Sequence, residues 1–176
     1  MNTPISTIAL DNGMQDVLDV CQTIRIECAE LHHYYSDLFG NDRTVMLFWK
    51  RTALEEESSA REFAICARLW RRKAIHSFRV DPLDAQIALI YVKSVAEKYR
   101  AIPPSPADAL KSSISLEEKL ARFQLHNIVK FTEPSFHRLF DRVKMADRNR
   151  IISFRKAYEE LEKPDPDHGF QSDSIL

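Results

Sequence analysis

Glycine is scarce in this sequence, with only three in 176 residues. Turn-rich β proteins and phosphate-binding loops both depend on glycine, because it adopts left-handed backbone conformations at little cost. The shortage therefore argues against an all-β fold and against a glycine-rich phosphate cradle. It favours long helices joined by few connections.

Disulfides, membrane spans and a strong net charge are missing as well. The cysteines are Cys21, Cys28 and Cys66, and an odd number does not make a disulfide framework. We therefore expect a reducing, cytoplasmic setting. No apolar run is long enough to span a membrane, and residues 1–12 lack the basic start of a secretory signal. A formal net charge of -1 predicts neither nucleic acid nor a membrane surface as a partner.

The composition that remains is that of one globular domain. At 176 residues and 44% hydrophobic content, the chain can bury a core without metals or disulfides. Turn and cap residues predict a loose leader over 1–13, a single helical domain over 14–163 and a disordered tail over 164–176. Within the domain, the predicted helices span residues 14–39, 43–74, 82–100, 115–131 and 134–162.

Cap residues and one linker set these helix boundaries. Asp42 is placed to cap the second helix. Ser115, with Glu118 three residues later, forms a capping box predicted to open the fourth helix after a Pro/Ser linker over 103–113. The resulting order is hairpin, long connection, hairpin, with an extra helix over 82–100 in the connection. A four-helix bundle with one long crossover has this chain order.

Each of the four predicted bundle helices carries an apolar stripe that a polar residue interrupts. Residues three or four apart along a helix share a face, so these polar residues are predicted to point inward. A lone buried carboxylate costs several kcal/mol unless it is paired, protonated or bound to metal. The stripes therefore predict a shared polar centre, although a slightly rotated bundle would place these groups at its rim. The interrupting residues are Glu27, Glu56, Asn127, Asp147 and Arg150.

The first two helices resemble the rubrerythrin-like branch of the ferritin-like superfamily. Glu27 precedes Tyr34 with the spacing of that family's first helix. Glu56 and Ser59 stand where the second helix of the family has Glu-x-x-His. The resemblance implies an all-α, ferritin-like four-helix bundle, built from two antiparallel hairpins and a long crossover that carries an extra helix. It also implies the positions of a di-iron site.

The second half of the chain departs from the family's ligand pattern. Asn127 stands at the position of a ligand glutamate, and Asp147 and Arg150 replace the final Glu-x-x-His. Such di-iron sites use four carboxylates and two histidines, and both histidines are missing here. The guanidinium of Arg150 is a permanent cation and no metal ligand. The resemblance therefore implies a degenerate site with no cofactor or with weakly bound iron.

Three functions follow from this degenerate site. We favour a non-catalytic structural or partner-binding module, as a homodimer or with another protein. The first alternative is an iron- or peroxide-handling protein with an unusual metal site made of Glu27, Glu56 and Asp147. The second is a metal site completed across a homodimer. Whether the chain is an enzyme stays open at this point.

Two further groups of residues are candidates. Glu30 and His33 form a Glu-x-x-His one turn beyond Glu27, although a solvated helix face explains them more simply. If no metal fills the centre, we expect the Arg150 guanidinium to occupy the metal position and to bridge Glu27 or Glu56. The remaining hydrogen bonds would come from Asp147, Ser59 and Asn127. The predicted core polar cluster consists of Ser59, Asn127, Arg150 and Tyr34.

Overall fold

The structure is a computed structural model that describes residues 5–131 and 134–162, and nearly all of these residues are helical. The prediction of an all-α protein is confirmed. For some residues inside these elements, Asp147 among them, only the backbone is described. The long helices are α1 (Ile5–Leu38), α2 (Arg43–Arg71), α3 (Pro82–Ala101), α4 (Pro106–Leu120) and α6 (Pro134–Leu161).

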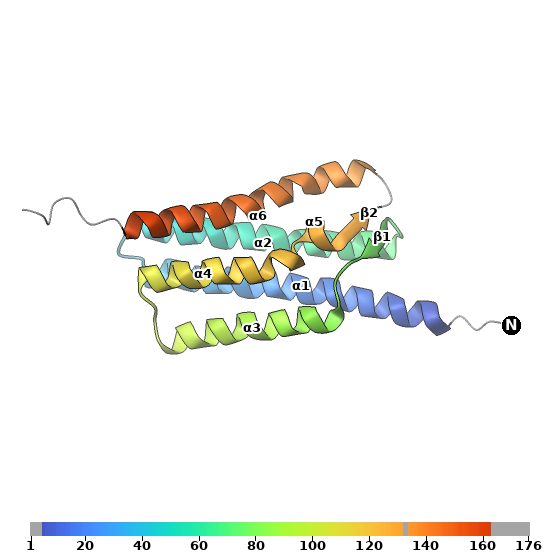
Figure 1. Cartoon of the computed structure of the whole chain (residues 1–176), viewed down its shortest axis with the longest axis horizontal. Coiled ribbons are helices and arrows are strands. Elements are labelled where there is room, and N and C mark those ends of the chain that lie inside the picture. The colour runs from blue at the N-terminus through green and yellow to red at the C-terminus, as the bar shows by residue number, and fades with distance from the viewer. Residues whose placement is uncertain (1–4, 132–133, 163–176) are drawn as a thin grey trace, which may run out of the picture.

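The long helices lie side by side with their axes roughly parallel or antiparallel (Figure 1). Helices α1 and α2 form an antiparallel hairpin, and α2 and α4 run in the same direction. Helix α3 connects them by running back along the molecule, packed against α1. Its inner face carries the small residues Ala85, Ala88 and Ala96, which allow this close packing.

Short elements close one end of the molecule, where the sequence predicted a continuous helix over 115–131. Helix α4 instead ends at Leu120 and is followed by the 3-10 turn η1 (Ala121–Phe123) and the short α5 (Leu125–Ile128). Strand β2 (Val129–Phe131) then pairs antiparallel with β1 (Ile75–Phe78). Backbone groups of both segments find partners across this ladder, so neither segment needs a helix to satisfy them.

The start of α4 also differs from the prediction. The Ser105 hydroxyl accepts a bond from the Asp108 amide at 3.1 Å and donates to the Asp108 carboxylate at 2.7 Å. Pro106 occupies the first turn, where its missing N–H costs nothing. The N-cap therefore lies at Ser105, and Ser115 is inside the helix. The predicted cap at Asp42 is confirmed, since it accepts from the amides of Thr44 and Val45 at 2.8 and 3.1 Å.

The structure tests the predicted leader in part and does not describe the predicted tail. Helix α1 begins at Ile5, so a loose leader over 1–13 is wrong for residues 5–13. Residues 1–4 and the predicted disordered tail over 164–176 lie outside the described residues. None of the described helices combines the length and the apolar character that crossing a membrane requires.

Candidate functional site: a buried arginine–glutamate quartet

Four ionisable side chains meet in the middle of the packed helices, one each from α1, α2, α4 and α6. None is more than 2% exposed, which is rare for charged groups unless they are paired. Because all four are buried, water does not screen their charges. We call this group the ionic quartet; its members are Arg25, Glu56, Glu117 and Arg150.

Each arginine contacts both glutamates. The Nε of Arg150 lies 3.0 Å from Oε1 of Glu117 and 3.1 Å from Oε1 of Glu56. From the other side, Nη1 of Arg25 donates to Oε2 of Glu56 at 3.2 Å and lies 3.6 Å from Oε1 of Glu117. Cations and anions therefore alternate around a closed ring. This arrangement ties all four helices together through their side chains.

The two carboxylates differ in how strongly they hold a proton. The pKa of Glu56 is raised to about 8, because burial and the neighbouring charge of Glu117 together outweigh the opposing effect of Arg150 and Arg25. Burial also acts on Glu117, but Arg150 and Arg25 outweigh it and lower its pKa to about 2. Glu117 is therefore the ionised member of the pair at neutral pH, and Glu56 is the member that holds a proton most readily.

An aromatic layer lies beside the ionic quartet. The ring of His32 stacks on Trp49 with centroids 5.5 Å apart and lies 5.7 Å from Phe154. Its Nε2 is 3.3 Å from the hydroxyl of Ser113. Burial lowers the pKa of His32 to about 3, so the imidazole is neutral at physiological pH. It acts here as an aromatic core residue and adds no charge to the centre.

The prediction that Glu56, Ser59 and Arg150 point into the core agrees with this geometry. Glu56 and Ser59 both face the core, with exposed fractions of 0% and 6%. Arg150 is buried and contacts Glu56, as expected for a guanidinium at the centre. The polar centre itself was therefore predictable from the stripes of α2 and α6.

Two residues of α1 lie elsewhere than predicted. Glu27 faces α3, where its carboxylate lies 3.5 Å from Nζ of Lys93. The Tyr34 hydroxyl donates to the carbonyl of Tyr99 at 3.0 Å, also on α3. The inward face of α1 is rotated by one residue from the predicted stripe, so Arg25 lies at the centre in the place expected for Glu27.

The predicted contribution of the second hairpin also needs correction. Asn127 is exposed in α5, where its amide nitrogen donates to the carbonyl of Ala121 at 2.7 Å. Because α4 begins earlier than predicted, Glu117 supplies the inward carboxylate instead. The side chain of Asp147 lies outside the described residues.

The Glu30 and His33 pair is not brought together. Glu30 contacts Arg100 on α3 at 3.3 Å, whereas His33 bonds Glu57 on α2 at 2.9 Å. These side chains point to opposite neighbours of α1. Over residues 5–131 and 134–162, as far as side chains are described, no group of three or more histidine, cysteine or acidic residues is arranged to hold a metal ion.

Sequence reasoning missed Arg25 and Glu117, and for Arg25 a pattern was available. Cys21 and Cys28 are seven residues apart and both are buried, with Arg25 between them on the same helix face. His32 continues that face one turn further on. Helix α1 packs against α2 and α3 at once, so two adjacent stripes are buried and the outer one was mistaken for the central one.

Comparisons of this chain with protein-family models, with curated proteins and with solved structures found no match.

Proposed function

We propose that the chain is a ferritin-like helical bundle of rubrerythrin-like type, in which the ionic quartet takes the position of the di-metal site. Its function in this proposal is that of a non-catalytic, partner-binding module. One observation carries the proposal: each of the four bundle helices contributes one charged side chain to the centre, and two of the four are arginines. The order of hairpin, crossover and hairpin supports the same assignment.

The arginines leave the centre poorly suited to metal. A guanidinium keeps its proton at any physiological pH, so a metal ion near Glu56 and Glu117 would meet two permanent cations. One oxygen of each carboxylate already accepts from an arginine, Oε2 of Glu56 from Arg25 and Oε1 of Glu117 from Arg150. A metal ion that took these oxygens would leave two buried cations without those partners.

Metal content tests this part of the proposal. Protein purified without chelator should hold well under one iron per chain by elemental analysis, before and after anaerobic loading with ferrous iron. Arg150→His removes a cation and restores an expected ligand, so it should raise the bound iron above the wild-type level. Arg155→His, at an exposed position of the same helix, is the matched control and should not.

Two irons per chain in the wild type, lost on Glu56→Ala, would overturn the degenerate-site proposal. The iron- or peroxide-handling function would then replace it. If Glu27→Ala also lost the bound iron, Glu27 would be a ligand of that site, although it faces α3 in this structure.

The outer face of α3 is the surface proposed for the partner, which we take to be a second copy of the chain. Leu83, Ile87 and Ile90 recur at helical spacing and are 68%, 52% and 66% exposed. Asp84 and Arg122 form an ion pair at 3.3 Å beside them. In a twofold dimer such a pair can be exchanged between copies, because each side presents both signs.

Oligomeric state tests the proposed homodimer. Wild-type protein should sediment as a dimer in analytical ultracentrifugation, and the combined Leu83→Ser, Ile87→Ser and Ile90→Ser variant as a monomer of unchanged helicity. The control replaces Leu47 and Leu54 by serine, since these residues are equally apolar and each is 48% exposed on α2. A wild type that stays monomeric at every accessible concentration would contradict the dimer.

A further inference from the structure

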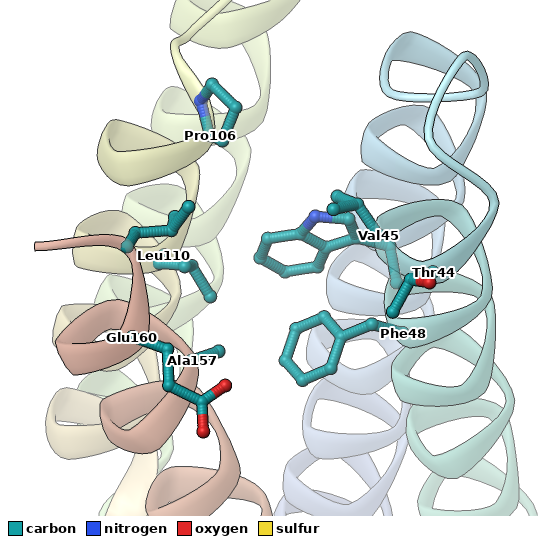
Figure 2. A pocket seen from close by; sticks show the side chains of 9 residues that line it. Thr44, Val45, Phe48, Pro106, Leu110, Ala157 and Glu160 are labelled. Atoms are coloured by element: carbon teal, nitrogen blue, oxygen red, sulfur yellow. The ribbon is translucent and has the colours of Figure 1, made fainter. Parts of the chain in front are cut away.

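An open pocket of about 270 Å³ lies far along the helices from β1 and β2, where the starts of α2 and α4 face the end of α6 (Figure 2). Its volume is close to the lower end of the range for small-molecule sites. Most of the side chains around it are apolar, and one is charged. Those that matter for its chemistry are Val45, Phe48, Trp49, Leu110, Ala157 and Glu160.

The aromatic wall of the pocket is fixed by the core behind it. Phe48 meets Trp49 edge to face, with centroids 5.2 Å apart, and lies 5.9 Å from Phe154. Trp49 in turn stacks on His32. A ligand would therefore find the wall already formed and would not have to order it on binding. Such a surface suits the apolar body of a small molecule.

Glu160 gives the pocket its charge. It is the one ionisable side chain among the lining residues, and Figure 2 shows its carboxylate directed into the gap that faces Phe48. In the part of the chain that the structure describes, Glu160 makes no ion pair. None of the described side chains therefore neutralises the charge that Glu160 presents to the pocket.

The helix ends around the pocket also favour a positively charged ligand. The amides at the start of α2 are bonded to Asp42, and the Asp108 amide at the start of α4 is bonded to Ser105, so these donors are not offered to an anion. The last turn of α6 contains no basic residue, so no side chain of that turn offsets the negative end of the helix dipole. Aromatic faces such as that of Phe48 also attract cations.

We propose that this pocket binds a small lipophilic cation, with its apolar body against Phe48, Trp49 and Leu110 and a primary ammonium group at Glu160. The head group would pair with a carboxylate at the mouth while the body leaves water. This site is separate from the ionic quartet and does not depend on the function proposed above.

Isothermal titration calorimetry with three ligands of one chain length tests the proposal: hexylammonium, hexanol and hexanoate. Hexylammonium should bind two- to fivefold more tightly than hexanol, as expected for one partly exposed ion pair. Hexanoate should bind most weakly, because its charge repels that of Glu160. In Glu160→Gln, the affinity for hexylammonium should fall to that for hexanol.

Two variants distinguish binding inside the pocket from a general attraction of cations to an acidic surface. Glu159→Gln removes the same charge from the adjacent exposed position, which does not line the pocket, and should leave hexylammonium binding unchanged. Ala157→Phe fills the cavity and should abolish binding of all three ligands while the circular dichroism spectrum is retained. The proposal is overturned if no ligand saturates, if hexanol binds as tightly as hexylammonium, or if Glu159→Gln weakens binding as much as Glu160→Gln.

Discussion

Arg150→Ala should lower the free energy of unfolding by about 3–5 kcal/mol at neutral pH, measured by urea denaturation. The substitution removes the cation that donates a hydrogen bond to Glu117 at 3.0 Å and leaves it with Arg25 at 3.6 Å. Water cannot replace the lost donor, because neither glutamate is more than 2% exposed. Most of the loss is therefore the cost of keeping the ionised Glu117 buried without its main partner.

The chain contains a closely matched control for this variant. Arg155 pairs with Glu118 at 2.6 Å, and this pair joins the same two helices as Arg150 and Glu117. Its side chains are 58% and 50% exposed, so Arg155→Ala should cost less than about 1 kcal/mol. If the two variants lost equal stability, burial would not be what makes the quartet important.

Replacing all four charges together separates the cost of breaking the quartet from its net contribution. A variant with methionine at 25 and 150 and leucine at 56 and 117 leaves none of the four charges of the quartet without its described partners. Buried ion pairs are often no more stabilising than apolar residues of similar volume. We therefore expect this variant to fold and to lose less stability than Arg150→Ala. A larger loss would show that the quartet stabilises the fold in its own right.

Stability should depend on pH in a way that identifies the protonated glutamate, with a plateau between about pH 4.5 and 6.5 and a decline on either side. The pKa of Glu56 is raised to about 8, so the folded state holds a proton that the unfolded state releases, and this contribution falls as pH rises from 4.5 to 8. The pKa of His32 is lowered to about 3, so its contribution falls as pH drops below about 6.5. Between about 4.5 and 6.5 the two slopes cancel, and above 6.5 only the decline from Glu56 remains.

Below that interval Glu117 adds to the acid sensitivity. Its pKa is lowered to about 2, so its contribution is present above the unfolded value of 4.5 and is lost as pH falls through 2. Acid should therefore unfold the protein steeply. On the alkaline side, the decline between pH 6.5 and 8 should reach about 2 kcal/mol.

Glu56→Gln isolates the alkaline part of this profile. Glutamine resembles the protonated acid in shape, so the variant should stay folded and lose the decline between pH 6.5 and 8. Urea denaturation across pH 4 to 9 measures both profiles. A wild-type profile that is flat from pH 6.5 to 8 would contradict a protonated Glu56 and indicate that both glutamates are ionised.

Helix α2 was predictable in detail because its neighbours bury only one of its faces. Trp49, Glu56 and Phe63 all face inward as their spacing predicts, and Asp42 caps the helix as expected. In α6, Arg150 and Phe154 also lie on the predicted face. A single apolar stripe on a helix with a clear cap leaves few alternatives for its orientation.

Helices α1 and α4 show where sequence patterns became ambiguous. Helix α1 is covered by two neighbours, so its buried arc is wide enough to contain two possible stripes, with Arg25 at the centre of one and Glu27 at the edge of the other. In α4, Ser105 and Ser115 are both followed by an acidic residue three positions later. The prediction took Ser115 as the cap. Asn127 was therefore expected to point inward, in the place that Glu117 occupies in the structure.

The sequence by itself therefore determined the helical class, the order of hairpin, connection and hairpin, and the presence of polar residues on inward faces. Helical spacing and capping are local properties, and a few neighbouring residues suffice to specify them. Only the tertiary structure decided which charges meet. Whether Glu56 pairs with Arg25 and Arg150 depends on the rotation of each helix and on where α4 begins, and both are set by packing between distant segments.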